Sequence, residues 1–237
     1  MRNERTSKDM RNISFEINVN LHAEGSCLVK FGNTHILCTA SIDEKPPPWL
    51  RNSGKGWVTA EYGMLPRSTN TRMDREAIKG KQSGRTQEIQ RLIGRSLRSI
   101  INLQNLGERQ IKIDCDVIQA DGGTRTASIS GGFVALYQAV SLLKKNYNIN
   151  KPIIKEFIAA VSAGIINDKP NLDLDYSEDF NAQVDANFVI CESGKIAEIQ
   201  STGEEYFFSR DQFNELFELA NKGINEIISK QKNILSL

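Results

Sequence analysis

Histidine is scarce in this sequence of 237 residues, which contains only His22 and His35. Neither lies with a serine or cysteine in a recognisable nucleophile motif, and the two do not form a metal-binding pair such as His-x-x-x-His. We therefore expect structural or surface roles for both. The sequence gives no support to a serine hydrolase, a cysteine protease or a zinc enzyme.

Cysteine and long apolar runs are also scarce. The four cysteines (Cys27, Cys38, Cys115 and Cys191) include no Cys-x-x-Cys pair, so we expect buried free thiols in a reducing cytosol. The N-terminal segment MRNERTSKDMRN has no apolar core, unlike a secretory signal. No stretch approaches the ~20 apolar residues of a membrane-spanning helix. The sequence therefore predicts a cytoplasmic protein that does not associate with a membrane.

Charge is nearly balanced overall, with a formal net charge of +1, but it is unevenly distributed. Residues 51–98 contain eleven lysines and arginines against four acidic residues, whereas residues 156–218 contain three against fourteen. A basic first half is typical of a protein that binds a polyanion, and an acidic second half is a plausible site for a divalent cation. Two differently solvated faces that meet across a subunit contact are an equally open alternative.

Hydrophobic periodicity predicts strands and helices without a strict βαβ alternation. Strand-like patterns occur at residues 13–19, 26–31, 34–42, 57–62, 110–118, 157–166, 183–190 and 195–202. Apolar stripes predict helices at residues 86–103, 128–145 and 210–229. Residues 64–85 are polar and basic, and we expect a long surface loop there. The predicted fold class is α+β, as a single domain of residues 1–237 with halves at approximately 1–147 and 148–237.

The segment QADGGTRTASISGGF carries the strongest local signal. Gly122 and Gly123 allow a tight turn from a strand into a helix, whose first N–H groups have no partners within the helix. Such a helix start binds anions, and Thr124 and Arg125 add a hydroxyl and a guanidinium that can grip phosphate oxygens. The alternative is an ordinary turn with a solvated arginine.

Arg85 lies at the start of the first long predicted helix, which is again a position that favours an anion. Arg91, Arg95 and Arg98 follow at steps of four and three, which places them along one face. For these three, RNA binding, a subunit contact and simple solvation all remain open.

The segment YSEDFNAQVDANFV brings Glu178, Asp179 and Asp185 close together in otherwise apolar surroundings. Asp185 begins a predicted strand, and Asp179 would lie in the preceding turn. Carboxylate oxygens are ligands for magnesium, which usually takes one or two of them with water and substrate phosphate. Surface acids in a turn are the alternative.

These segments together resemble the ribonuclease PH family, which also includes polynucleotide phosphorylase and exosome ring subunits. The resemblance covers essentially the whole chain. GWVTAEYGMLPR and DCDVIQADGGTRT are its longest and most specific motifs. The remaining segments that carry it are HAEGSCLVKFGNTHILCTAS, GKQSGRTQEIQRLIGRSLR and the Asp179/Asp185 pair.

The resemblance implies a ribonuclease PH-like fold with two similar βα halves, of the ribosomal protein S5 domain 2 type. It implies a phosphorolytic 3′-5′ exoribonuclease that trims transfer-RNA precursors and other RNA 3′ ends. Inorganic phosphate would be the co-substrate, nucleoside 5′-diphosphates the products, and nucleotide addition the reverse reaction. It also implies Mg²⁺, a homohexamer built as a trimer of dimers, and no DNA partner. A catalytically silent RNA-binding ring subunit and a hydrolytic metal-dependent exonuclease are the alternatives.

The resemblance also assigns residues. The expected phosphate-binding positions are Arg85, Gly123, Thr124 and Arg125. The expected catalytic and magnesium-binding pair is Asp179 and Asp185. The arginines expected to bind transfer RNA are Arg67, Arg72 and Arg75. Three features depart from the usual family pattern. Asn70 replaces a histidine, the acidic motif has Phe180 and Gln183 where a serine and a glutamate are usual, and the start MRNERTSKDMR lacks the usual Arg-Pro.

Overall fold

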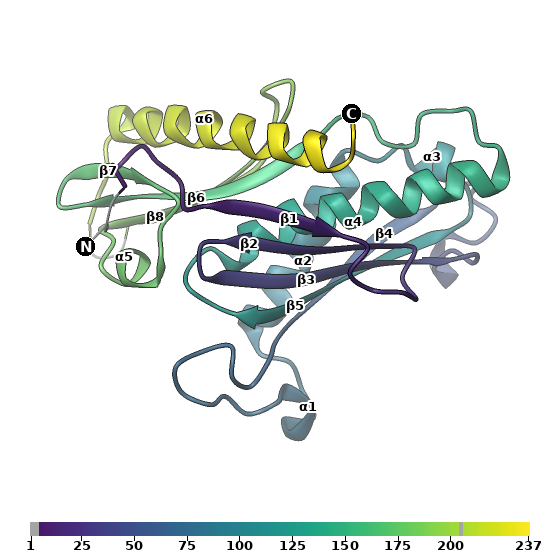
Figure 1. Ribbon diagram of the computed structural model, residues 1–237, viewed down its shortest axis with the longest axis horizontal. Coiled ribbons are helices and arrows are strands. Elements are labelled where there is room, and N and C mark those ends of the chain that lie inside the picture. The colour runs from purple at the N-terminus through teal and green to yellow at the C-terminus, as the bar shows by residue number, and fades with distance from the viewer. Residues whose placement is uncertain (1–4, 204–205) are drawn as a thin grey trace.

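The structure, a computed structural model, describes residues 5–203 and 206–237. Its first half contains a five-stranded sheet in the order β1-β2-β3-β5-β4 (Figure 1). β1, β2, β3 and β5 pair antiparallel, whereas β4 pairs parallel with β5, as a helical crossover between the two strands permits. The strands are β1 (Ile13–Ile17), β2 (Gly25–Phe31), β3 (Thr34–Asp43), β4 (Trp57–Met64) and β5 (Gln110–Gln119).

The second half contains a four-stranded antiparallel sheet in the order β7-β6-β8-β9. Its strands are β6 (Ile158–Ile166), β7 (Lys169–Leu172), β8 (Val184–Cys191) and β9 (Ile196–Gly203). The helices of the chain are η1 (Pro48–Leu50), α1 (Glu76–Lys79), α2 (Gly84–Ser99), α3 (Leu103–Leu106), α4 (Thr124–Tyr147), α5 (Tyr176–Phe180) and α6 (Arg210–Ile234). α6 covers the second sheet (Figure 1).

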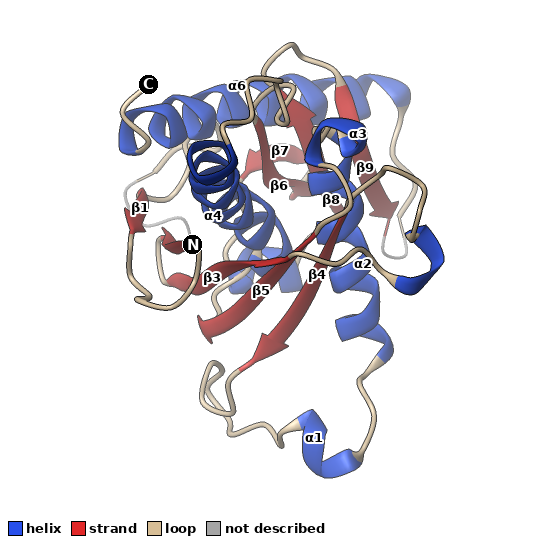
Figure 2. Cartoon of the chain, turned by 90° about the vertical axis from the view of Figure 1, so that its right-hand side faces the viewer, coloured by secondary structure: helices blue, strands red, loops and turns tan. Residues whose placement is uncertain are grey.

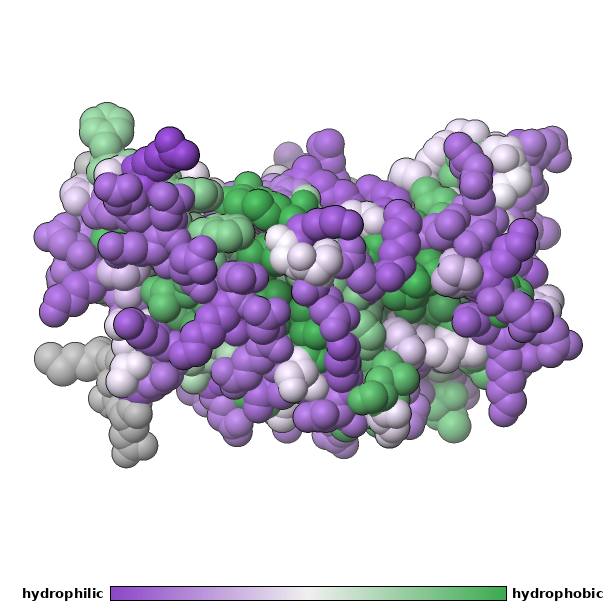
Figure 3. Space-filling model, turned by 90° about the horizontal axis from the view of Figure 1, so that it is seen from above, coloured by the Kyte–Doolittle hydropathy of each residue, from purple (hydrophilic) through white to green (hydrophobic). Residues whose placement is uncertain are grey.

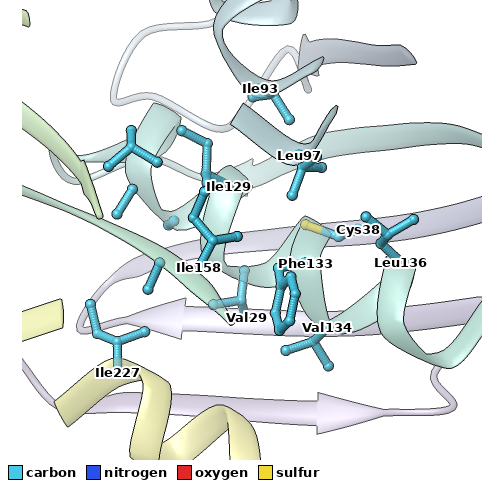
Figure 4. Packing of buried hydrophobic residues seen from close by; sticks show 14 of the residues in the cluster. Val29, Cys38, Ile93, Leu97, Ile129, Phe133, Val134, Leu136, Ile158 and Ile227 are labelled. Carbon is cyan, nitrogen blue, oxygen red and sulfur yellow. The ribbon is translucent and has the colours of Figure 1, made fainter. Parts of the chain in front are cut away.

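α4 joins the two halves because it packs against both sheets. It contacts β2, β3 and β5 of the first sheet and β6 of the second, while α2 packs on β4 and α4 (Figure 2). Figure 4 shows Phe133 and Ile129 of α4 among Val29 of β2, Leu97 of α2 and Ile158 of β6. One hydrophobic core therefore runs through both halves.

The predicted α+β class is confirmed, and each predicted strand has a counterpart. The three predicted helices are present, but α2 ends at Ser99, α4 begins already at Thr124, and α6 continues to Ile234. β7 and the short helices α1, α3 and α5 were not predicted, because four or five residues are too few to show a period. The expected loop at residues 64–85 is interrupted by α1 and ends where α2 begins.

The scarce residues behave as expected. All four cysteines are free and buried. His22 lies in the exposed turn between β1 and β2, and His35 is a half-buried residue of β3.

α4 corrects the expectation that no segment approaches a membrane span. Within the described chain it is long and apolar enough to cross a membrane, yet 78% of its most apolar window is buried inside the protein. A helix with protein on all sides is apolar all round, so α4 is the core helix of this fold.

The outer face near α6 is mostly hydrophilic, with hydrophobic residues exposed in its middle (Figure 3).

Candidate active site

The predicted glycine turn is present between β5 and α4. Gly122 and Gly123 have positive φ angles of 73° and 66°, which L side chains adopt only with strain. Gly123 is the N-cap of α4, so the first N–H groups of this long helix, which have no partners within the helix, lie at this point. The Thr124 hydroxyl lies 2.9 Å from the Tyr62 hydroxyl of β4. The turn thus has the backbone geometry that accepts an anion.

Arg125 reaches from the first turn of α4 to two other elements. Its guanidinium donates to Gln200 Oε1 of β9 at 3.1 Å and lies 3.6 Å from the Glu88 carboxylate of α2. Gln200 donates to the same carboxylate at 3.2 Å. Arg125 is therefore not a freely solvated arginine. Residues from both halves orient it, and an oriented donor needs little reorganisation when an anion binds.

Arg85 brings a second positive charge to this region. It lies in the first turn of α2, after the N-cap Ser83, and its side chain is exposed. Burial raises the pKa of Tyr62, while the Thr124 hydrogen bond and the charges of Arg85 and Arg125 oppose the rise. Tyr62 lines a cavity together with Arg85 and lies 2.9 Å from the Thr124 hydroxyl, so the N-termini of α2 and α4 meet at Tyr62.

Asp179 lies on the short helix α5 and not in an irregular turn as predicted. The helix forms because Asp175 and Glu178 make a capping box, with each side chain accepting from the other's backbone N–H at 3.0 and 3.1 Å. Surrounding protein raises the pKa of Asp179, although its side chain also reaches solvent, and the charges of Arg125 and Arg85 lower that pKa. The acidic residue and the two arginines are therefore within electrostatic reach.

Asp185 is the second residue of β8, where it pairs with Gly164 of β6 and Thr202 of β9. Across residues 5–203 and 206–237, no group of three or more histidine, cysteine or acidic residues could hold a metal ion. Carboxylates are the type of ligand that Mg²⁺ takes, usually one or two of them together with water and substrate phosphate. They do not fit a closed zinc site.

The glycine turn is packed directly against the segment that leads into α5. A Cβ atom on Gly122 would lie 2.5 Å from the Leu174 carbonyl oxygen and 2.6 Å from the Asp175 carbonyl carbon. Only glycine allows this approach. The two sites predicted separately from the sequence are consequently held together by backbone contact.

Arg11 stabilises the same contact between the glycine turn and the segment before α5, because it bonds to a residue on each side. Its Nε and NH2 donate to the two Asp173 carboxylate oxygens at 2.9 and 2.7 Å, and its NH1 donates to the Asp121 carbonyl. Both charged side chains are buried, with 8% and 1% of their surface exposed. Nearby, Arg5 donates to the Glu178 carboxylate at 2.8 Å. A segment from the start of the chain thus ties the glycine turn to α5.

The three predicted RNA-binding arginines lie on the loop after β4, but in different settings. Arg67 lines an open cavity of about 700 Å³, and Arg75 lines a second one of about 240 Å³ that also contains Arg85. Met73 borders both cavities. Arg72 borders neither and pairs with Asp74 at 3.2 Å on the exposed surface.

The basic face of α2 is partly structural. Arg95 forms an ion pair with Glu198 of β9, and Arg98 donates to the Val58 carbonyl at 2.8 Å and lies over the Trp57 ring. Arg91 is exposed. Simple solvation therefore does not describe Arg95 and Arg98.

The three substituted positions, Asn70, Gln183 and Phe180, have different surroundings. Asn70 lines the larger cavity. Gln183 exchanges hydrogen bonds with Asp168 in the turn between β6 and β7, where the amide fits better than a second carboxylate would. Phe180 is 78% exposed.

Sequence reasoning missed Tyr62, Gln200 and Arg11, which support the site from β4, β9 and the N-terminal segment. Each makes its contact with a residue far away in the chain, so no local spacing indicates it. The capping box of α5 was a readable signal, because Asp175 and Glu178 have the required spacing.

Known proteins resemble this chain along its whole length. Residues 9–141 match the model of the 3′ exoribonuclease family, domain 1, and residues 156–223 match that of domain 2. A ribonuclease PH of Mesorhizobium japonicum is 62% identical over 94% of each chain. A ribonuclease PH of Brucella melitensis is 58% identical over 96% of each chain.

Solved structures show the same fold at low identity. Rice Rrp46 superimposes with a TM-score of 0.80 at 18% identity, covering 99% of each chain. A chain of the Archaeoglobus fulgidus exosome with RNA bound to the active site gives a TM-score of 0.76 at 18% identity, covering 95% of this chain and 90% of that one. The predicted family and fold are confirmed: the chain belongs to the ribonuclease PH family of phosphorolytic 3′ exoribonucleases.

Proposed function

We propose that this chain trims the 3′ ends of transfer-RNA precursors with inorganic phosphate held by Arg85, Arg125, Gly123 and Thr124. The observation that carries the proposal is that the N-termini of α2 and α4 meet at Tyr62, which lines a cavity with Arg85 and contacts Thr124, while Gly122 packs against the segment that leads into the helix of Asp179. Membership of a phosphorolytic family supports it.

The chemistry requires one anion to attack another. An oxygen of the bound phosphate attacks the last phosphodiester phosphorus, and the bond from that phosphorus to the preceding 3′-oxygen breaks. The attacking hydrogen phosphate gives up its proton and the leaving 3′-oxygen takes one up, so the products are a nucleoside 5′-diphosphate and RNA shorter by one residue. Arg85 and Arg125 offset the repulsion, and positioning supplies most of the acceleration. Because one phosphate linkage replaces another, the reaction is reversible.

Asp179 and Asp185 are proposed as the acidic pair of the site. Together they would hold Mg²⁺, which supplies charge stabilisation for the reacting phosphoryl group. Desolvation by surrounding protein raises the pKa of Asp179, and the charges of Arg125 and Arg85 oppose that rise because they favour the carboxylate.

Capture of the RNA is assigned to Arg67, Arg72 and Arg75. Their loop is exposed and basic, and single-stranded ends are held mainly through backbone charge. Transfer-RNA precursors are the proposed substrates because relatives named ribonuclease PH share the whole chain.

We also propose a homohexamer, as a trimer of dimers, in the cytoplasm. Structural likeness to exosome chains supports a ring, and free buried cysteines suit a reducing compartment. Residues 1–237 should act as one domain, since one core spans both sheets. Sedimentation at several concentrations tests the hexamer, and a single cooperative unfolding transition tests the one domain.

The function is tested with a transfer-RNA precursor that carries a short 3′ extension, incubated with magnesium in the presence and absence of inorganic phosphate. Nucleoside diphosphates released only with phosphate support the proposal. Monophosphates released without phosphate would mean hydrolysis. Intact RNA binding with no release would mean a silent ring subunit.

A further inference from the structure

α5 exposes two aromatic side chains that the phosphorolysis proposal does not use. Tyr176 is 60% exposed and Phe180 is 78% exposed. Their ring centroids are 6.3 Å apart, with an interplanar angle of 31°. Together the two rings form an exposed apolar patch, and such a patch marks an interaction site where polar residues surround it.

The helix directs these rings to the same side as the reacting groups. Tyr176, Asp179 and Phe180 are spaced i, i+3 and i+4, so they share one face of α5. Glu178 points to the other side, where it is buried and bonded to Arg5. The capping box and this ion pair fix the helix, so the rings are presented by an anchored element.

The surroundings of the rings favour a nucleic acid over an apolar partner. Tyr176 lines the larger cavity together with Arg67 and several polar side chains of the same loop. The Tyr176 N–H donates to Asp121 at 3.3 Å, at the glycine turn. One cavity therefore offers a cation for a phosphate and a ring for a base, which is the combination that single-stranded RNA requires.

We propose that Tyr176 and Phe180 form a stacking platform for unpaired bases near the RNA 3′ end, positioned to deliver the last phosphodiester to Asp179. This rests on the proposed function, because it needs the reaction to occur beside α5. Stacking reads the flat face of any base, so the platform holds the 3′ end without selecting its sequence.

The proposal is tested by RNA binding without phosphate, so that no turnover occurs. Wild-type protein is compared with Phe180→Tyr, Phe180→Leu and the Tyr176→Leu/Phe180→Leu double variant. The RNAs carry either normal bases or abasic sites at the last three nucleotides, and a third RNA carries fluorescent 2-aminopurine there. Leu21→Ser, at an even more exposed apolar position in the β1–β2 turn, is the control.

Wild-type protein should bind the normal 3′ end about tenfold more tightly than the abasic one and quench 2-aminopurine. Phe180→Tyr and Leu21→Ser should keep both properties, Phe180→Leu should lose part of them, and the double variant should lose both. An unchanged preference in the double variant would overturn the proposal. So would a change in oligomeric mass, which would make the rings a subunit contact.

Product analysis separates this proposal from the proposed function. If wild-type protein releases nucleoside diphosphates with phosphate but shows no base preference, only the stacking platform is wrong. If no diphosphates appear at all, the proposed function is wrong, whatever the rings bind.

Discussion

The glycine turn at residues 121–125 and the arginine loop at residues 64–75 both offer positive charge, but they are built differently. The glycine turn is packed against the segment before α5, and its Arg125 is held by residues of α2 and β9. The arginine loop is mostly exposed, and its Arg72 pairs only with a near neighbour at the surface. The difference separates two tasks: rigid charges suit chemistry, and exposed charges suit capture.

The largest effect is expected at the proposed acidic pair. Asp185→Asn should reduce turnover by about a thousandfold or more at every magnesium concentration, since metal stabilisation amounts to several kcal/mol. The measurement is phosphate-dependent trimming across a magnesium titration. Glu215→Gln, on the exposed face of α6, is the control that should keep normal rates. Normal activity of Asp185→Asn would remove this residue from the site.

Arg125→Ala should lower phosphate-dependent trimming by about 10²–10³-fold, because an oriented donor to the reacting anion is lost. RNA binding should be largely kept. Trimming rates and RNA affinity are measured on the same preparations. Arg51→Ala, which removes an exposed arginine between β3 and β4, is the control. Equal loss of both properties would contradict the assigned role.

Gly122→Ala should damage the junction between the halves. The new Cβ meets the Leu174 carbonyl oxygen at 2.5 Å and also forces a strained φ, which together should cost about 1–3 kcal/mol of unfolding free energy. Gly54 has a similar φ of 70° but open space around its Cβ position. Gly54→Ala therefore measures the backbone strain alone, without the steric clash. Denaturant unfolding compares the two. Equal destabilisation would mean that the close approach to α5 is unimportant.

Smaller effects are expected in the arginine loop. Arg67→Ala should weaken RNA binding several-fold and reduce the salt slope by about one, because one phosphate contact is lost. Arg72→Ala should do less, since Asp74 already competes for its guanidinium. Affinity is measured over a range of salt concentrations. A larger effect at Arg72 than at Arg67 would reverse the order that the structure indicates.

Sequence patterns predicted the long elements and the kinds of residue in the candidate site, because both depend on local spacing. DGGTRT predicted the helix start at Thr124 more accurately than hydrophobic periodicity did, since the glycines determine where the chain turns. The sequence could not predict that this turn touches α5, because Gly122 and Leu174 meet only through tertiary packing. Arg11 was missed for the same reason, as Asp173 lies in the other half.

α5 shows how a short element escapes prediction. Five residues give no hydrophobic period, and apolar alternation cannot reveal an exposed pair such as Tyr176 and Phe180. The consequence is functional, since this helix carries Asp179. A local capping signal was the only guide to it in the sequence.

The most direct test of the separation between chemistry and capture is a crossed kinetic measurement on Arg125→Ala and Arg67→Ala. The KM for phosphate, the Kd for RNA and the turnover rate are determined for each variant with the same transfer-RNA precursor. Arg125→Ala should change the phosphate KM and the rate while leaving the RNA Kd nearly constant, and Arg67→Ala should do the reverse. If both variants change the same constant, the two regions share one task and the account is wrong.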